Sequence, residues 1–181
     1  MKQNYLLLIG LIMAVLVISG CTSPEPSNNT DNETTSNETT TTNDLTPDSI
    51  KSIVDWDLGD IKNVTIKEDV VTITYDLGFV NDNDYVIFKS SEDAINVLPK
   101  LFNDNNRIKS VKLIATEGDT GNDAVRMTVK RSTANRIDWD DANRDLTSNK
   151  ASFLSLVDSY QIRPGIYKEL TLSLPYGMEK T

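Results

Sequence analysis

Two pairs of short segments alternate between apolar and polar residues, which is the pattern of half-buried β-strands. Residues 62–67 and 70–75 form the first pair, and residues 111–115 and 125–130 form the second. A mainly polar connection joins the members of each pair. We therefore expect two β-hairpins, each with one buried face and one face in water.

Helical periodicity follows each predicted hairpin. Apolar residues recur at helical spacing over residues 94–102, after a Ser-Ser-Glu-Asp sequence at 90–93 that is typical of a helix N-terminus. Pro99 interrupts this pattern, so we expect a kink there. Another apolar stripe predicts a helix over residues 149–160, and a Thr-Pro start predicts a shorter amphipathic helix over residues 46–56.

Weaker patterns remain in three places. Residues 85–88 are predicted as a strand or as the lead-in to the following helix, residues 133–145 as a polar helical or turning segment, and residues 170–174 as a final strand. The order hairpin, helix, hairpin, helix favours an α+β fold, namely a single antiparallel sheet with helices packed on one face in a ββα-ββα-like order.

The first 21 residues follow a different pattern. Lys2 lies in a short polar start, an apolar run extends from Leu6 to Ile18, and Ser19, Gly20 and Cys21 follow it. A basic start, a short apolar run and small residues at a cleavage site are the parts of a secretory signal peptide. The apolar run is short for a segment that spans a bilayer.

The Leu-Val-Ile-Ser-Gly-Cys sequence that ends at Cys21 resembles the lipobox of prokaryotic surface lipoproteins, archaeal or bacterial. The resemblance implies cleavage before Cys21, a lipid on its thiol, and a location anchored to the cell membrane and facing outside the cytoplasm. It covers residues 1–21 and carries no activity. The rest of the chain resembles no functional family.

Residues 22–44 consist almost entirely of Thr, Asn, Ser, Glu, Asp and Pro. Such a segment has no apolar side chains to bury, so its ordering entropy is not offset and we expect disorder. The predicted organisation is a signal peptide over residues 1–20, a lipidated cysteine and linker over residues 21–45, and one α+β domain over residues 46–181.

The sequence pattern Asn-X-Thr occurs in the linker and in the first predicted hairpin. It gives four candidate N-glycosylation sites, Asn28, Asn32, Asn37 and Asn63. The alternative is that abundant Asn and Thr produce the pattern by chance.

The chain is acidic, with 18 Lys and Arg against 27 Asp and Glu and a formal net charge of −9. Removal of residues 1–20 takes away one Lys and no acid, which leaves 17 against 27 and a net charge of −10. This is the wrong sign for a nucleic-acid-binding protein. The chain contains no His and one Cys, which excludes His-dependent nucleophilic catalysis, intrachain disulfides and cysteine-based zinc sites. No cofactor is predicted.

Clusters of acidic residues raise the question of a metal site. They are Asp55 with Asp57 and Asp60, residues 81–84, and Asp138 with Asp140 and Asp141. None has the spacing of an EF-hand loop, in which alternate acids precede a Gly and a distal Glu. We therefore interpret them as solvated loop acids and predict no metal, with one weak Ca²⁺ site as the alternative.

The sequence Asp-Trp-Asp occurs at residues 55–57 and again at residues 138–140. An exposed Trp beside carboxylates suits the binding of a sugar ring. Two carboxylates held roughly 5 to 9.5 Å apart also hydrolyse glycosidic bonds. The alternative is that each Trp packs at the edge of the core.

Basic residues recur at outward positions of the predicted strands. They are Lys67, Lys109, Lys112, Arg126 and Lys130. If helices cover one side of the sheet, these residues form a positive face for an acidic partner, an anionic lipid or a glycan. The alternative is ordinary solvation, with Lys protecting the sheet edges.

These patterns favour a non-catalytic interaction module whose partner is an unknown surface protein or polymer. Two alternatives remain, a glycan-acting enzyme that uses carboxylates and a structural spacer in the cell envelope.

Overall fold

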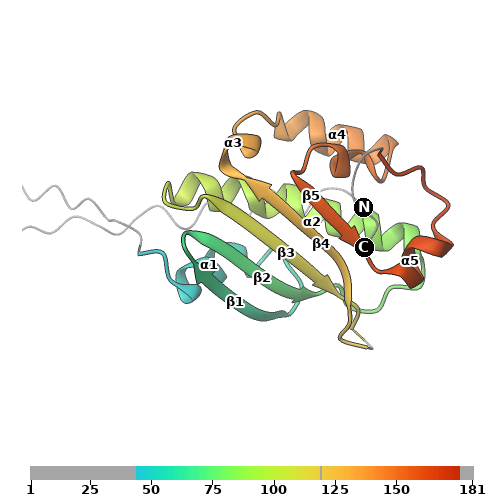
Figure 1. Cartoon of the computed structure of the whole chain (residues 1–181), viewed down its shortest axis with the longest axis horizontal. Coiled ribbons are helices and arrows are strands. Elements are labelled where there is room, and N and C mark those ends of the chain that lie inside the picture. The colour runs from blue at the N-terminus through green and yellow to red at the C-terminus, as the bar shows by residue number, and fades with distance from the viewer. Residues whose placement is uncertain (1–43, 119, 176–181) are drawn as a thin grey trace, which may run out of the picture. The chain divides into compact units, whose positions relative to one another are not determined.

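The computed structural model describes residues 44–118 and 120–175, so the predicted signal peptide, Cys21 and most of the linker lie outside the described residues. The described residues form one five-stranded sheet with helices packed against one side (Figure 1). The prediction of an α+β fold with a single sheet is confirmed.

The elements follow one another as helix, hairpin, helix, hairpin, short helices, strand and helix. Their bounds are α1 Pro47–Val54, β1 Ile61–Lys67, β2 Val70–Asp76, α2 Asn83–Asp104, β3 Ser110–Thr116, β4 Asp123–Lys130, α3 Arg131–Ala134, α4 Trp139–Ser148, the 3₁₀-helix η1 Ser152–Ser155, β5 Ser159–Ile162 and α5 Pro164–Glu169. Both predicted hairpins are present, with a helix after each.

The strands lie in the order β1-β2-β3-β4-β5, and the sheet is mixed. Three of the four neighbouring pairs are antiparallel, but β2 and β3 are parallel, with Val71 opposite Val111 and Ile73 opposite Leu113. The prediction of a purely antiparallel sheet was therefore wrong. The chain leaves the end of β2, returns along α2 and enters β3 in the direction of β2, which is how a helical crossover produces a parallel pair.

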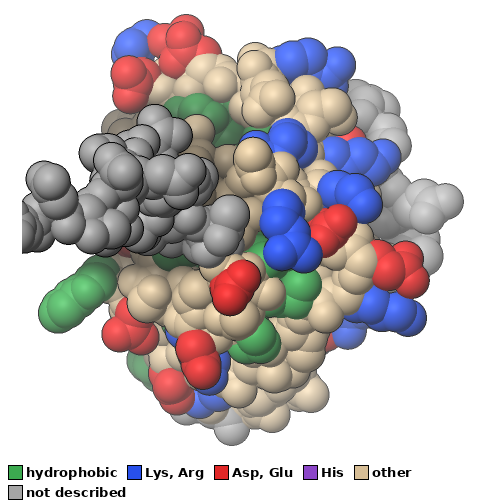
Figure 2. Space-filling view, turned by 90° about the vertical axis from the view of Figure 1, so that its left-hand side faces the viewer, with side chains coloured by type: hydrophobic (Ala, Val, Ile, Leu, Met, Phe, Trp, Pro, Cys, Tyr) green, Lys and Arg blue, Asp and Glu red, His purple; other side chains and the backbone are tan. Residues whose placement is uncertain are grey.

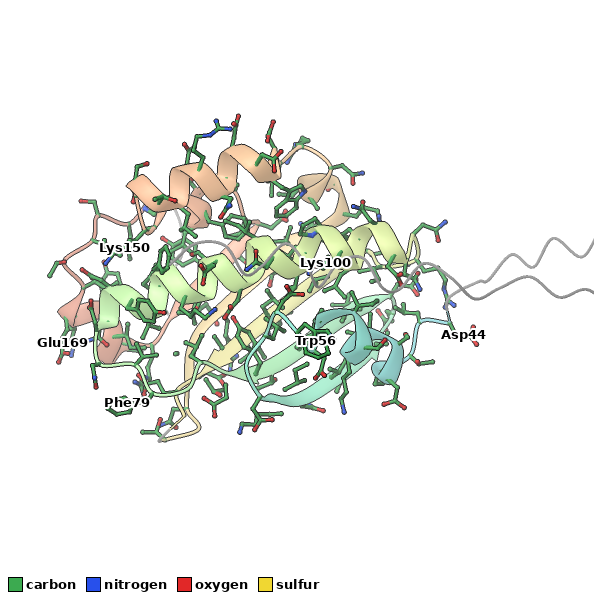
Figure 3. All side chains as sticks on the ribbon, turned by 180° about the vertical axis from the view of Figure 1, so that it is seen from behind. Asp44, Trp56, Phe79, Lys100, Lys150 and Glu169 are labelled. Atoms are coloured by element: carbon green, nitrogen blue, oxygen red, sulfur yellow. The ribbon has the colours of Figure 1, made fainter. Side chains whose placement is uncertain are left out.

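Helix α2 is the main cover of the sheet. Its 22 residues correspond to a length of about 33 Å, and its apolar side, including Leu98 and Leu101, is fully buried. The helix is continuous through Pro99. Figure 3 shows α2 between α1 on one side and α4 on the other. Within the described residues, no helix is long and apolar enough to cross a bilayer.

Both ends of α2 are capped by side chains. At the N-terminus, the carboxylate of Asp82 accepts a hydrogen bond of 2.9 Å from the backbone N–H of Asp84. The last turn contains no basic residue, and Arg131 at the start of α3 supplies the positive charge instead. Its guanidinium donates to the carbonyls of Phe102, Asn105 and Ile108 at 2.9, 2.6 and 2.7 Å. The bond to Phe102 satisfies a carbonyl that the helix end leaves without a partner, and the other two fix the C-cap and the loop that follows it.

The C-terminal part differs from the prediction. Instead of a helix over residues 149–160, η1 follows α4 and the chain then extends into β5. Phe153, Leu154 and Tyr160 are buried, so the apolar spacing reflects a tight turn followed by a strand. The predicted strand over residues 170–174 was also wrong, because that segment contains no strand.

Two hydrogen bonds attach this last segment to α2. The backbone N–H of Thr171 donates to the carboxylate of Asp84 at 2.9 Å, and its hydroxyl donates to the same group. Residues 85–88, predicted as a strand or a lead-in, form part of α2.

A polar group is buried between β2 and α2. The carboxylate of Asp93 is 1% exposed and accepts a hydrogen bond of 2.6 Å from Nζ of Lys89. Burial raises the pKa of the Asp93 carboxyl above its usual value, and the bond from Lys89 opposes this rise. Burial, together with the charge of Asp93, also raises the pKa of the Tyr75 hydroxyl. The core of this domain therefore contains a buried carboxyl, Asp93, which pairs with the partly exposed Lys89.

We predict that Arg131→Lys lowers the free energy of unfolding by about 2 kcal/mol, because a lysine ammonium cannot reach three carbonyls with the fixed fork of a guanidinium. Urea denaturation measures the change. Arg136→Lys is the matched control, since Arg136 makes only a 3.4 Å contact with the hydroxyl of Thr133. Equal losses in the two variants would contradict the capping role of Arg131.

We also predict that Asp93→Asn changes how stability depends on pH. The folded-state pKa of Asp93 is raised, so its stabilising contribution is present below the unfolded pKa near 4 and is lost as pH rises through the folded value. The difference in unfolding free energy between wild type and Asp93→Asn should therefore fall with rising pH. Denaturation between pH 3 and 7 tests this, and Lys89→Met should move the fall to higher pH. A difference that rises with pH would contradict the prediction.

Candidate interaction surface on the open side of the sheet

Among the described residues, no helix packs against one side of the sheet, as Figure 1 shows from the front. Side chains on each strand alternate between the buried side and this side, which we call the open face. The open face consists of Asn63, Thr65, Lys67, Val70, Thr72, Thr74, Asp76, Ser110, Lys112, Ile114, Arg126, Thr128, Lys130, Ser159 and Gln161. Asp76 is the one acid in this set and pairs with Lys62 at 3.2 Å.

The strand register arranges the basic residues of the open face in neighbouring rows. Lys67 is opposite Val70, Val70 is opposite Ser110, and Ser110 is opposite Lys130. Lys67 and Lys130 are therefore three strand spacings apart, which is about 14 Å between their backbones. The next row contains Lys112 opposite Thr128. The positive charges thus cross the sheet and form a cluster at one end.

Four of the five residues of the predicted positive face lie on the open face, namely Lys67, Lys112, Arg126 and Lys130. Lys109 does not belong to it, because it precedes β3 and stands three positions before Lys112, out of phase with the alternation. Lys109 lies instead at the end of the sheet where the β1–β2 turn is. We call this end of the sheet the turn end. The Nζ of Lys109 is 2.9 Å from the carboxylate of Asp69 in that turn.

The basic residues of the open face differ in how far acids neutralise them. The guanidinium of Arg126 donates to Asp123, and Nζ of Lys130 lies 3.8 Å from the carboxylate of Asp158. Among the described residues, Lys67 and Lys112 make no ion pair. These two lysines have the charge that is most readily offered to a ligand.

The turn between β1 and β2 combines strain and charge. Glu68 and Asp69 have φ angles of 53° and 65°, in the left-handed region that few residues other than Gly and Asn adopt. The carboxylate of Asp69 lies between two cations, Lys109 at 2.9 Å and Arg107 at 3.8 Å. The hydrogen bond from Lys109 holds the pKa of Asp69 below its usual value.

Arg107 extends the positive charge to the turn end, and sequence reasoning missed it. It follows α2 in the loop before β3, outside any strand pattern, and the structure brings it to Asp69 across the sheet end. Figure 2 faces this end of the molecule and shows Lys and Arg outnumbering Asp and Glu on its right-hand half, the side of the open face. Arg107 and Lys109 thus add to the positive charge of Lys67 and Lys130 at this end of the molecule.

The remaining side chains of the open face are mostly small and polar. Hydroxyl and amide groups alternate with the basic residues, and the apolar members are Val70 and Ile114. No aromatic residue of the described strands lies on this face. The face therefore offers many hydrogen-bond donors and acceptors but no large apolar anchor.

The acidic clusters are used in local structure. Asp57 and Asp60 pair with Lys100 and Lys62 at 2.6 and 2.7 Å. Among residues 81–84, Asp82 caps α2 and Asp84 holds the backbone of the C-terminal segment. Asp138 caps α4 by accepting from the backbone N–H of Asp141 at 3.0 Å. In the part of the chain that the structure describes, no three acids or cysteines are arranged to hold a metal ion.

The two Asp-Trp-Asp segments lie apart. Trp56 follows α1 and is 93% exposed, whereas Trp139 begins α4 and packs on Phe153 with ring centroids 6.2 Å apart. Figure 3 shows α2 running between α1, next to the labelled Trp56, and α4. The two segments therefore form no shared carboxylate pair.

A hollow of about 350 Å³ lies beside α4. Its acidic lining consists of Asp138, Asp141 and Asp145. Asp138 is the cap of α4, and Asp141 is paired with Arg144 at 2.5 Å. Two of the three carboxylates are thus already bonded to neighbouring groups.

Only one candidate modification site lies within the described residues. Asn63 is exposed on the open face, in the edge strand β1. Cys21, Asn28, Asn32 and Asn37 lie outside the described residues.

Comparison of the chain with models of protein families, with curated proteins and with solved structures found no match.

Proposed function

We propose that this chain is a lipid-anchored, non-catalytic interaction module that faces outside the cytoplasm and binds an acidic partner through the open face. The lipobox-like sequence before Cys21 supports the anchor and the location. The open face supports the binding role, because it is an extended polar surface that no described element covers.

The observation that carries this proposal is the pair of lysines without ion-pair partners, Lys67 and Lys112, on the open face of an acidic protein. The chain has nine more acids than bases, yet among the described residues no acid lies within ion-pair distance of either lysine. A local positive potential of this kind steers an oppositely charged partner and fixes its orientation.

The placement of the acids favours binding over the glycan-hydrolase alternative. Such an enzyme needs two carboxylates on either side of one glycosidic bond. The Asp-Trp-Asp segments lie on opposite sides of α2, and two of the acids beside the hollow at α4 are bonded to their own neighbours.

The predicted linker is long enough to let a partner reach the open face. The predicted linker of roughly 25 residues has a root-mean-square span of about 25 to 30 Å as a flexible chain. Asp44, where the described chain begins, lies at the end of the molecule that also holds the C-terminus of α2 (Figure 3). A linker of this length leaves the domain free to turn its open face toward a partner.

We predict that cross-linking on intact cells captures an acidic partner with the wild-type chain, and that Lys67→Glu/Lys112→Glu reduces the capture at least severalfold by reversing the local potential. Lys150→Glu/Lys168→Glu is the matched control, because both lysines are exposed outside the open face and the net charge changes equally. Cys21→Ala should abolish capture at the cell surface by removing the anchor.

The proposal fails if the wild type captures nothing, which would favour the spacer alternative. It also fails if both double variants capture the partner as well as the wild type does. Thermal unfolding of each variant establishes that the domain is folded.

A further inference from the structure

We propose that the occupant of the open face is a linear polysaccharide that carries carboxylate or sulfate groups. This inference rests on the proposed function, since it names the class of partner for the same surface.

The spacing of the cations suits an extended polyanion. Lys67 and Lys130 are in register across four strands, about 14 Å apart at the backbone, and Lys112 lies in the adjacent row between them. Long lysine side chains with exposed ammonium groups can each meet one anionic group of a polymer that runs across the strands. A single small anion would contact only one of them at a time.

The neutral residues between the cations suit a hydroxyl-rich polymer. Thr65, Thr72 and Thr128 lie in the same row as Lys112, so hydroxyl groups flank this cation on both sides. A hydroxyl both donates and accepts hydrogen bonds, as the hydroxyl groups of a sugar do.

The same composition disfavours a protein or a membrane as the occupant. The cores of protein interfaces are enriched in aromatic and other large anchors, and the strands carry none on this face. Proteins that lie on membranes combine basic residues with apolar side chains that enter the lipid. Trp56, the most exposed large apolar side chain, belongs to the α1 side of the molecule instead (Figure 3).

At the turn end, the carboxylate of Asp69 would compete with an anionic ligand for Lys109 and Arg107. Its carboxylate lies 2.9 Å from Lys109 and 3.8 Å from Arg107, in the way that a ligand anion would pair with these cations. Removal of this charge should release both cations for the polysaccharide. Asp69→Asn is suited to the test, because Asn tolerates the positive φ of 65° at this position.

The experiment measures binding of the purified full chain, in detergent, to immobilised dextran sulfate and to uncharged dextran at physiological salt. We expect binding to dextran sulfate alone, and weaker binding at higher salt. Lys67→Gln/Lys112→Gln should weaken it about tenfold, the equivalent of roughly 1.4 kcal/mol. Asp69→Asn should strengthen it about threefold, and Lys150→Gln/Lys168→Gln should leave it within about twofold.

Three results would overturn the inference: no binding to dextran sulfate, equal binding to uncharged dextran, or equal loss in the two double variants. Poly-glutamate and vesicles of anionic lipid serve as competitors. Free dextran sulfate is the reference competitor. If poly-glutamate or the vesicles displace the chain from immobilised dextran sulfate at a lower concentration of negative charge than free dextran sulfate needs, the occupant is an acidic protein or a membrane and the inference is wrong.

The two proposals fail in different ways. If the open face is required for capture on cells but the chain does not bind dextran sulfate, the interaction module stands and the polysaccharide is excluded. If neither experiment depends on Lys67 and Lys112, both proposals are wrong.

Discussion

The burial of α2 against one side of the sheet is the interaction on which the rest of the structure depends. This helix connects β2 to β3, so its return path sets the parallel pair at the centre of the sheet. It also supplies the buried side chains that cover the strands, with α1 and α4 packed along its two flanks (Figure 3). Because all this apolar surface is on one side, no described element covers the other side of the sheet.

The distribution of charge follows from this asymmetry. On the helical side, acids cap helix ends or pair with lysines, as Asp82 and Asp57 do. The strands alternate, so polar positions collect on the open face, where Lys67 and Lys112 have no acid within ion-pair distance among the described residues. A protein with excess negative charge thus presents a locally positive surface. The net charge bears on the solubility of the protein, whereas the strand register decides where its positive side chains gather.

The sequence predicts β1 to β4 and the central part of α2 well, because their apolar residues repeat with clear periods of two and 3.6 residues. These periods do not indicate whether neighbouring strands are parallel or antiparallel, which is why the parallel pairing of β2 with β3 was not predicted. The apolar spacing of Phe153, Leu156, Val157 and Tyr160 has the period of a helix, but the structure has a tight turn followed by a strand there, with Leu156 exposed, so β5 was missed too.

The candidate surface was predicted in part. Alternation identifies Lys67, Lys112, Arg126 and Lys130, and counting along β3 would have excluded Lys109, which is out of phase. Arg107 lies in a loop, and its approach to the turn end depends on tertiary contacts that no local pattern contains.

The parallel pair also determines the order in which this domain can assemble. Each hairpin closes over a few residues and can form within microseconds, but neither buries its apolar side until α2 is in place. The pairing of β2 with β3 joins segments about 40 residues apart, a slow event because loop closure precedes any gain from contact. Until that pairing forms, any hairpin that closes leaves its apolar side exposed to water. The time that pairing takes, rather than the final stability, sets the exposure of a newly synthesised molecule to aggregation and proteolysis.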